Sequence, residues 1–415
     1  MGTGKTSGMI KYINTHPHEK YMFITPFISE IARVIANCPL LNFHQPEDNN
    51  FGKLADIKNL IANGENIAST HALFYLFDKS IINLIQKSGY ILILDEVLEI
   101  IEPIKISKKD MHMLTHDNII FIDENNTLSV IDKTYRGVEN KFNREIQTIK
   151  NHHVIIQKST ISNIDKEYKD IDKNAPILCL FNSNIFKCFS DIFVLTYLFE
   201  GSIMQSYFKL FDLQWDYFYI NNYKIYTGKY NDYDFKVTAN NLINLYNGNL
   251  NKIGDNYGAL SATWFKNIKK QKEHIVLKNN MYNYFKNIVK SNCNKAAWST
   301  ITGYNDRIKD KFAPKGFTKN CFIPCNARAT NRFSHKTDLI YALNVYPNPL
   351  IFTYLIQNNI YLDKNAYALS QLVQWIWRSA IRNNQPINLY LPSARMRKIF
   401  LGYLNVNDEL AKSAG

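Results

Sequence analysis

The chain has 415 residues, of which 46% are hydrophobic and 20% charged, so its composition is that of a globular protein large enough for two domains. A formal net charge of +13 favours nucleic acid as a partner, and an anionic membrane second, although a basic surplus can also serve only solubility. There is no signal peptide and no apolar run near the ~18 residues of a membrane span, so we expect a cytoplasmic protein without a membrane partner. The six cysteines are scattered and include no C-x-x-C pair, so buried free thiols are a better interpretation than a zinc site.

The chain begins with a glycine-rich loop typical of phosphate binding. In such a loop the backbone N–H groups surround the phosphates, the lysine reaches the β- and γ-phosphates, and the threonine holds Mg²⁺. The residues expected to bind ATP in this way are Gly2, Thr3, Gly4, Lys5 and Thr6. The complete pattern would place its first glycine one residue before the chain starts, and the strand that leads into the loop would also lie upstream. We therefore expect a first domain that lacks its leading strand.

Short apolar strands alternate with helical stretches along the first half. We expect strands over residues 20–25, 66–70, 90–94, 153–157 and 192–195, with helices at 29–36 and from residue 72. The strand at 90–94 is apolar throughout, as buried parallel strands are. In the second half we expect an aromatic stretch at 215–219 that passes between domains, a helix over 365–383, and strands at 319–323 and 387–391. The alternation predicts an α/β fold with parallel sheets. No third domain for a nuclease or specificity function is apparent.

An acidic pair, Asp95 and Glu96, follows the apolar strand at 90–94. An aspartate at this position accepts from Mg²⁺-bound water, and a neighbouring glutamate orients or deprotonates the attacking water. Asp95 and Thr6 are therefore the expected metal residues, and Glu96 is the expected catalytic base. Taken alone, such a pair is equally compatible with a solvated acidic loop. The glycine-rich loop upstream makes a site for ATP and Mg²⁺ the better interpretation.

A second candidate element lies far downstream, where Gln374, Arg378 and Arg382 are spaced four residues apart. On a helix this spacing puts them on one face. Arginines that project from a second domain can stabilise the transferring phosphate of a nucleotide bound to the first. The alternative is a solvated basic face with Trp375 and Trp377 in the core.

These elements together resemble the superfamily-2 helicases and translocases, in the style of those encoded by phages and mobile elements. The loop resembles their first motif, Asp95 and Glu96 their D-E-x-x box, and the Gln374 segment their sixth motif. The resemblance implies two RecA-like P-loop NTPase domains, at residues 1–202 and 203–415. ATP would bind between the two domains, with Gln374 as one of its contacts. It also implies nucleic-acid contacts at Thr25 and Thr70, and a coupling motif at residues 195–198. The second arginine falls four residues after the first instead of three, so the resemblance leaves open which one is the arginine finger.

Residues 290–336 contain ten Lys or Arg and two acidic residues, interleaved with aromatic side chains. Basic side chains follow a phosphate backbone and aromatic rings stack on splayed bases. Arg328, Thr330 and Arg332 are the expected nucleic-acid contacts in this stretch, at the place of the family's fifth motif. A basic loop over core aromatics is the alternative.

The sequence thus predicts an ATP-dependent helicase or translocase that acts on single-stranded or tailed DNA in replication or recombination. Glu96, Arg378 and Arg382 are the expected catalytic residues. One alternative is another ATP-driven DNA motor, of the packaging or restriction kind. The other is a non-catalytic nucleic-acid-binding protein with a decayed P-loop.

Overall fold

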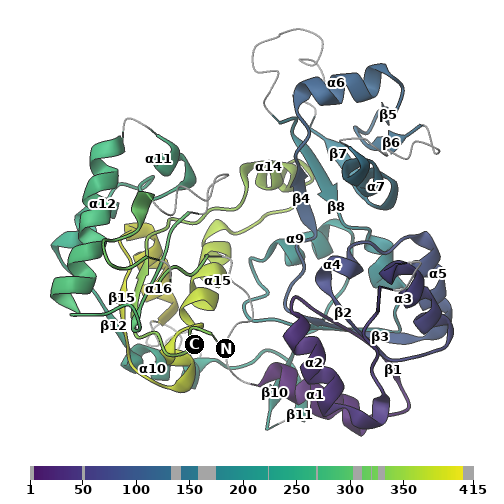
Figure 1. Ribbon diagram of the computed structural model, residues 1–415, viewed down its shortest axis with the longest axis horizontal. Helices are drawn as coiled ribbons and strands as arrows, with labels where there is room; N and C mark the ends of the chain where they lie inside the picture. The colour runs from purple at the N-terminus through teal and green to yellow at the C-terminus, as the bar shows by residue number, and fades with distance from the viewer. Residues whose placement is uncertain are drawn as a thin grey trace, which may run out of the picture.

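The computed structural model of the protein describes residues 4–48, 52–131, 142–157, 174–222, 224–267, 270–301, 311–318, 320–325 and 332–404. The chain forms two units that lie side by side, with an inserted unit above the first (Figure 1). Among these described residues, no helix is both long enough and apolar enough to span a bilayer.

The first unit is built on a four-stranded parallel sheet in the order β2-β1-β3-β9. Its strands are β1 (Lys20–Thr25), β2 (Ile67–Thr70), β3 (Tyr90–Asp95) and β9 (Asp191–Leu195). Its helices are α1 (Lys5–Thr15), α2 (Ile28–Asn37), α3 (Lys53–Ala62), α4 (His71–Phe74), α5 (Lys79–Ser88) and α9 (Ile203–Leu210), with short 3₁₀ turns η1 (Pro39–Leu41) and η2 (Ser183–Lys187). Among the described residues, the outer edge of β9 pairs with no strand.

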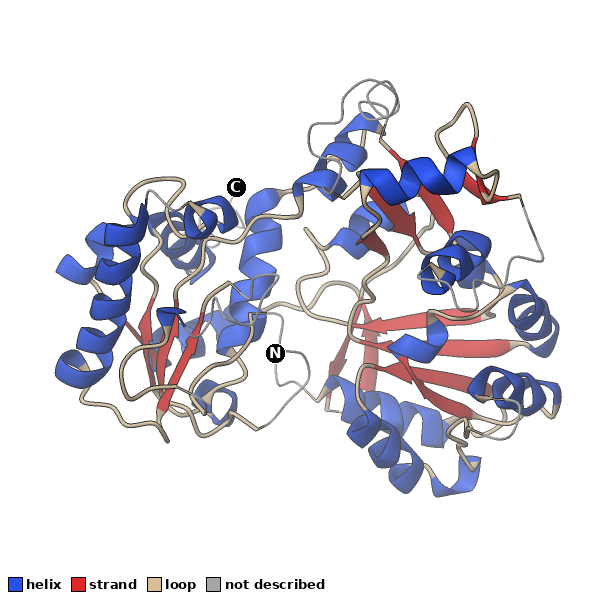
Figure 2. Cartoon of the chain, turned by 45° about the horizontal axis from the view of Figure 1, so that its top comes forward, coloured by secondary structure: helices blue, strands red, loops and turns tan. Residues whose placement is uncertain are grey.

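Helices cover both faces of this sheet, as Figure 2 shows. Successive strand residues point to opposite faces, so Tyr21 and Phe23 pack with α1 and α2, whereas Met22 and Ile24 pack with α3 and α5. All six residues of β3 are buried. Burial on both faces explains why these strands read as continuous apolar runs in the sequence.

An inserted unit with its own hydrophobic core separates β3 from β9. Its elements are β4 (Ile101–Ile104), α6 (Lys108–His116), β5 (Ile120–Ile122), β6 (Leu128–Val130), α7 (Asn143–Asn151), β7 (His153–Ile156) and β8 (Ile177–Leu180). Strands β4, β8 and β7 form an antiparallel sheet in that order. This unit is an addition to the two domains expected from the sequence. The expected strand near residue 153 exists, but it belongs to this antiparallel sheet.

The second unit also has a four-stranded parallel sheet, in the order β12-β15-β14-β13. Its strands are β12 (Ile243–Leu245), β13 (Ala296–Ser299), β14 (Asp338–Tyr341) and β15 (Ile387–Tyr390). Its helices are α10 (Tyr233–Leu242), α11 (Ala262–Lys266), α12 (Gln271–Asn283), α14 (Pro349–Gln357), α15 (Lys364–Ile376) and α16 (Ala394–Leu404), with short turns η3 (Asn249–Gly254), η5 (Tyr284–Ile288) and η6 (Ala380–Asn383). The expected α/β class with parallel sheets is confirmed. Of the strand expected at 319–323, residue 319 lies outside the described residues, and residues 320–323 form one bridge, between Trp298 and Phe322.

Three segments cross the boundary expected at residue 203. Helix α9 lies in a core of the first unit through Met204 and Tyr207. The antiparallel hairpin of β10 (Phe218–Asn221) and β11 (Lys224–Thr227) packs on α1. The aromatic stretch at 215–219 therefore covers the first unit. Helix α14 belongs by sequence to the second unit, but its Ile351 and Leu355 lie in the same core as α9. Because α14 also packs against β4, it joins the second unit to the insertion.

Candidate active site

The first part of the site is the start of α1. Gly4 precedes this helix with a φ of 70°, a left-handed conformation that favours glycine, and a Cβ at Gly4 would meet no atom within 4 Å. The first N–H groups of α1 have no partners within the helix and carry the positive end of its dipole. A helix start with open space around the Gly4 Cβ position is suited to an anion. Gly2 and Thr3, expected to complete this loop, lie outside the described residues.

The second part is a direct bond between the loop and the acidic strand. The Thr6 hydroxyl donates to Oδ1 of Asp95 at 3.0 Å, although the two residues come from different elements. Asp95 ends β3 and is only 6% exposed. Its pKa is raised to about 7, first by burial and then by the charge of Glu96, against the lowering effect of the Thr6 bond. A buried carboxyl with a raised pKa next to a hydroxyl forms a pair of oxygen ligands suited to Mg²⁺.

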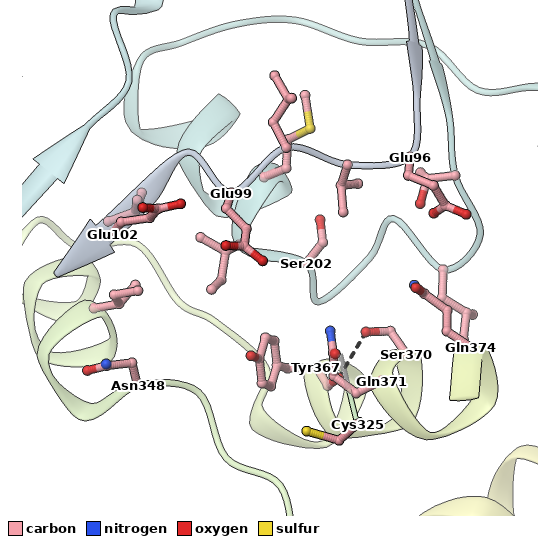
Figure 3. Close-up of a pocket in the computed structure, with 18 of the residues that line it drawn as sticks. Glu96, Glu99, Glu102, Ser202, Cys325, Asn348, Tyr367, Ser370, Gln371 and Gln374 are labelled. Atoms are coloured by element: carbon pink, nitrogen blue, oxygen red, sulfur yellow. Dashed lines mark hydrogen bonds between the residues drawn. The ribbon is translucent and has the colours of Figure 1, made fainter. Parts of the chain in front are cut away.

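Glu96 follows Asp95 in an unusual backbone conformation. Its φ is 75°, which is uncommon for a residue with a side chain and costs on the order of 1 kcal/mol. Its N–H donates to the Leu195 carbonyl at 3.2 Å, so the end of β3 is tied to the end of β9. This turn directs Glu96 toward the second unit, where it lines a cavity together with Gln374 (Figure 3).

The two candidate arginines occupy different environments. Helix α15 ends at Ile376, so Arg378 and Arg382 do not continue the helical face of Gln374. The expected helix through residue 383 was wrong. Ser379 has extended backbone angles, and its hydroxyl donates to the Ile376 carbonyl at 2.7 Å, which helps to end the helix.

Arg378 is buried at 4% exposure, whereas Arg382 is exposed on η6. The charge of Arg382 also acts on Lys5. Burial lowers the pKa of Lys5 most, Glu96 and Asp95 raise it, and Arg382 lowers it further. Arg382 therefore lies near the start of α1, and it comes from the second unit. Of the two candidate arginines, Arg382 is the one whose charge acts on Lys5.

A cavity of about 310 Å³ continues from Glu96 between the units. Figure 3 shows Glu96, Glu99 and Glu102 on one side of it and residues of α15 on the other. The α15 residues that line it are Tyr367, Ser370, Gln371 and Gln374. The three glutamates make this part of the cleft unfavourable for a phosphate backbone, because like charges would face each other. Gln374 lines the same cavity as Glu96, the expected base.

Tyr197 links the two units next to Lys5, and sequence reasoning assigned it no role of its own. The Lys5 Nζ lies 6.0 Å from the centre of the Tyr197 ring. The Tyr197 hydroxyl bonds to Asp232 Oδ2 at 3.2 Å and to the hydroxyl of Tyr403. Asp232 also forms a 3.1 Å ion pair with Lys236. The resemblance placed a coupling motif at this position, but only the fold brings its tyrosine to Lys5 and to α16.

The expected nucleic-acid residues are not all accessible. Thr25 is completely buried, and its hydroxyl has no hydrogen-bond partner among the described residues, so its side chain does not offer a surface contact. Thr70 is half-buried and caps α4, accepting from the Leu73 N–H at 3.3 Å. Arg332 is exposed. Arg328 and Thr330 lie outside the described residues.

Comparisons with known proteins identify relatives of the whole chain. Residues 237–404 match the family described as the YonV C-terminal Rossmann-like domain. The solved structure of Xpd4 from S. tokodaii is similar with a TM-score of 0.42 and 12% identity, covering 97% of this chain and 92% of that one. Likeness of that degree does not carry a function from one protein to the other. The SPbeta prophage-derived uncharacterized protein YonV of Bacillus subtilis is 35% identical over 415 residues, with 97% of each chain covered. The chain therefore belongs to the family of this prophage-derived protein YonV.

Proposed function

We propose that this protein is an ATP-dependent motor that acts on nucleic acid and hydrolyses ATP between its two units. The main support for this proposal is the hydrogen bond between Thr6 and Asp95. In addition, the charge of Arg382 from the second unit lowers the pKa of Lys5. The loop, the acidic strand and the arginine are far apart in sequence. Their meeting at one point supports an intact nucleotide site over a decayed one.

Each residue has a chemical task in this proposal. The start of α1 and Lys5 bind the phosphates, and Thr6 and Asp95 hold Mg²⁺, which neutralises charge on the phosphates when bound. Glu96 orients or deprotonates the attacking water, and Arg382 stabilises the charge that develops on the transferred phosphate. The residues fit Mg²⁺ because the buried Asp95 carboxyl would gain a cation that offsets the cost of its ionisation.

Nucleic acid is the proposed partner because of the net charge of +13 and the basic, aromatic stretch around Arg332. We expect single-stranded or tailed DNA, bound with little sequence preference. Binding through phosphates should weaken steeply as salt is raised, because neutralised phosphates release counterions.

The test is ATP hydrolysis with and without a single-stranded oligonucleotide. We expect hydrolysis to be stimulated by the oligonucleotide and to fall at least about a hundredfold in Lys5→Ala, since removal of one charge-stabilising group costs roughly that much. Lys11→Ala is the matched control, because Lys11 is exposed on the same helix. Turnover that Lys5→Ala leaves unchanged, or DNA binding without any turnover, contradicts the proposal.

A strand-displacement assay on tailed duplexes then separates unwinding from movement along one strand. We expect displacement to require a hydrolysable nucleotide and to disappear in Lys5→Ala. Stimulated hydrolysis without displacement identifies a translocase, which moves along one strand without separating the duplex.

A further inference from the structure

A second cavity lies on the second unit, outside the candidate active site. It has a volume of about 440 Å³, within the range of about 300–1,000 Å³ typical of small-molecule sites. We call this cavity the Arg332 pocket. It is lined by Cys293, Asn294, Asn320, Phe322, Arg332, Phe333, His335 and Lys336. The pocket lies before the amino ends of β13 and β14, which begin at Ala296 and Asp338.

The lining of this pocket is suited to an anion. Arg332, His335 and Lys336 are cationic or can become so, and the described lining residues include no Asp or Glu. Lys336 is only 3% exposed, and its Nζ donates to the Cys293 carbonyl at 2.7 Å. Burying an ammonium group is costly, and a bound phosphate would reduce that cost. Burial accordingly lowers the pKa of Lys336.

Two aromatic rings complete the pocket. Phe322 is half-buried and packs edge-on against Trp298 at 4.8 Å between ring centres, so its position is fixed. Phe333 is also half-buried, and the Arg332 guanidinium lies 5.9 Å from its ring centre. Rings of this kind stack on unpaired bases, and an arginine beside them adds a phosphate contact.

The pocket is tied to the segment that carries the candidate finger. The Ala380 N–H donates to the Lys336 carbonyl at 2.9 Å, and Asn383 Nδ2 donates to the Ser334 carbonyl at 3.3 Å. Arg382 lies between these two anchor residues on η6. A ligand that contacts residues 332–336 is therefore linked by two hydrogen bonds to the backbone on both sides of Arg382.

We propose that the Arg332 pocket binds one nucleotide unit, with a phosphate at Arg332 and Lys336 and a base against Phe322 or Phe333. The unit comes from a nucleic-acid strand or from a free nucleotide, since both present the same phosphate and base. Binding there holds η6 and so positions Arg382. Binding of a strand rests on the proposed nucleic-acid partner, and the positioning of Arg382 rests on the proposed hydrolysis, but neither binding measurement requires turnover.

Alkylation of a cysteine in the pocket can report on ligand binding. Cys293 lines it and is the exposed one among six free cysteines, of which four are buried and Cys325 is intermediate. The experiment measures the rate of Cys293 alkylation in the Lys5→Ala protein, which removes phosphate binding by the loop at α1. The probes are an oligothymidylate, AMP and inorganic phosphate, each titrated in turn without Mg²⁺.

We expect the oligothymidylate or AMP to slow alkylation of Cys293 with saturation, and Arg332→Ala to weaken that protection by about tenfold, the order of one stacked base or phosphate contact. Arg144→Ala, which removes an exposed arginine from α7, is the control and should leave protection unchanged. Protection by the oligonucleotide alone identifies a strand, and protection by AMP identifies a free nucleotide. Protection by neither, or protection equal in Arg332→Ala, overturns the proposal.

A second variant guards against loss of the fold. His335 is exposed, so His335→Ala should melt at the wild-type temperature and still weaken protection several-fold. The proposed function is judged separately, by ATP turnover of the wild-type protein. Protection without turnover leaves this inference standing and removes the motor, whereas stimulated turnover without protection removes only the inference.

Discussion

The two parallel sheets have the same number of strands, yet they present their candidate chemistry at opposite ends. In the first sheet Asp95 ends β3, and Thr25 and Thr70 end the two strands beside it. In the second sheet Arg382 lies on η6, directly before β15, and Lys336 lies directly before β14. The candidate active site thus combines residues at the carboxyl ends of the first sheet with Arg382, which precedes β15 at the amino end of the second sheet.

The carboxyl end of the second sheet is instead occupied by packing contacts. Arg395, which follows β15, donates to the Asn344 side chain and to the carbonyls of Val345 and Lys364. A Cβ added to Gly254 would lie 1.9 Å from the Pro392 carbonyl oxygen, so the backbones there are in direct contact. Two sheets of the same kind therefore do not imply the same site, because the candidate functional residues lie at a different end of the sheet in each unit.

Among the substitutions that test this arrangement of the two sheets, we expect the largest loss of turnover at Arg382. Arg382→Ala should lower kcat by roughly 10³–10⁵-fold, the range for loss of an arginine finger, with an unchanged melting temperature because the side chain is exposed. Arg378→Ala should instead lower stability by about 2–5 kcal/mol, since Arg378 is buried. Steady-state kinetics and thermal melts of both variants check this. If Arg378→Ala alone stopped turnover in a fully stable protein, the assignment of the finger would be reversed.

The next effect concerns the carboxyl end of the first sheet. Glu96→Gln should reduce kcat by roughly 10²–10⁴-fold, because the amide cannot accept a proton from water, while nucleotide affinity is retained. Glu99→Gln is the control, since Glu99 lines the same cavity without lying next to Asp95. Single-turnover hydrolysis and equilibrium binding of a nucleotide analogue separate the two steps. Equal losses in both variants would contradict a special role for Glu96.

A smaller effect is expected from the pH dependence of Asp95. The pKa of Asp95 is raised to about 7, so the fold favours its protonated carboxyl. The stability gained from the protonated form is complete below about pH 4, the pKa of an aspartate in the unfolded chain, and is lost as the pH rises through about 7. Without Mg²⁺, Asp95→Asn should therefore gain on the order of 2–4 kcal/mol relative to wild type between pH 5 and pH 8.

Mg²⁺ should reverse this trend, because it binds the ionised carboxylate. The rise in the wild-type melting temperature on adding Mg²⁺ should be larger at pH 8 than at pH 6 and absent in Asp95→Asn. Asp216→Asn, which changes an exposed aspartate, should behave as wild type. A Mg²⁺ effect independent of pH would place the metal elsewhere.

The smallest effect should arise where the two units meet at Tyr197. Tyr197→Phe removes the hydroxyl that bonds to Asp232 and Tyr403 while keeping the ring beside Lys5. We expect a loss of about 1 kcal/mol, and a double-mutant cycle with Tyr403→Phe should show that the two losses are not additive. Denaturant unfolding measures the cycle. Strict additivity would mean that the hydroxyl pair does not connect the units.

Much of the fold follows from local patterns. Buried parallel strands must be apolar along their length, which is why the strands at 20–25 and 90–95 are visible in the sequence. The phosphate loop and the acidic pair are also local, since each needs only adjacent residues with fixed chemistry. The insertion was missed because its strands are short and antiparallel, and β7 by itself looks like one more strand of a parallel sheet.

The sequence by itself determined the α/β class, the loop at Lys5 and the acidic pair at Asp95, because these depend on neighbouring residues. Only the tertiary structure decided that Thr6 meets Asp95, that Thr25 is buried, and that the charge of Arg382 acts on Lys5. The reason lies in packing. Trp375 is buried and donates to the Ile323 carbonyl at 3.2 Å, and Trp377 packs on Phe235 with 4.7 Å between ring centres. These contacts lie on either side of the end of α15 at Ile376, and residue spacing along the chain cannot report them.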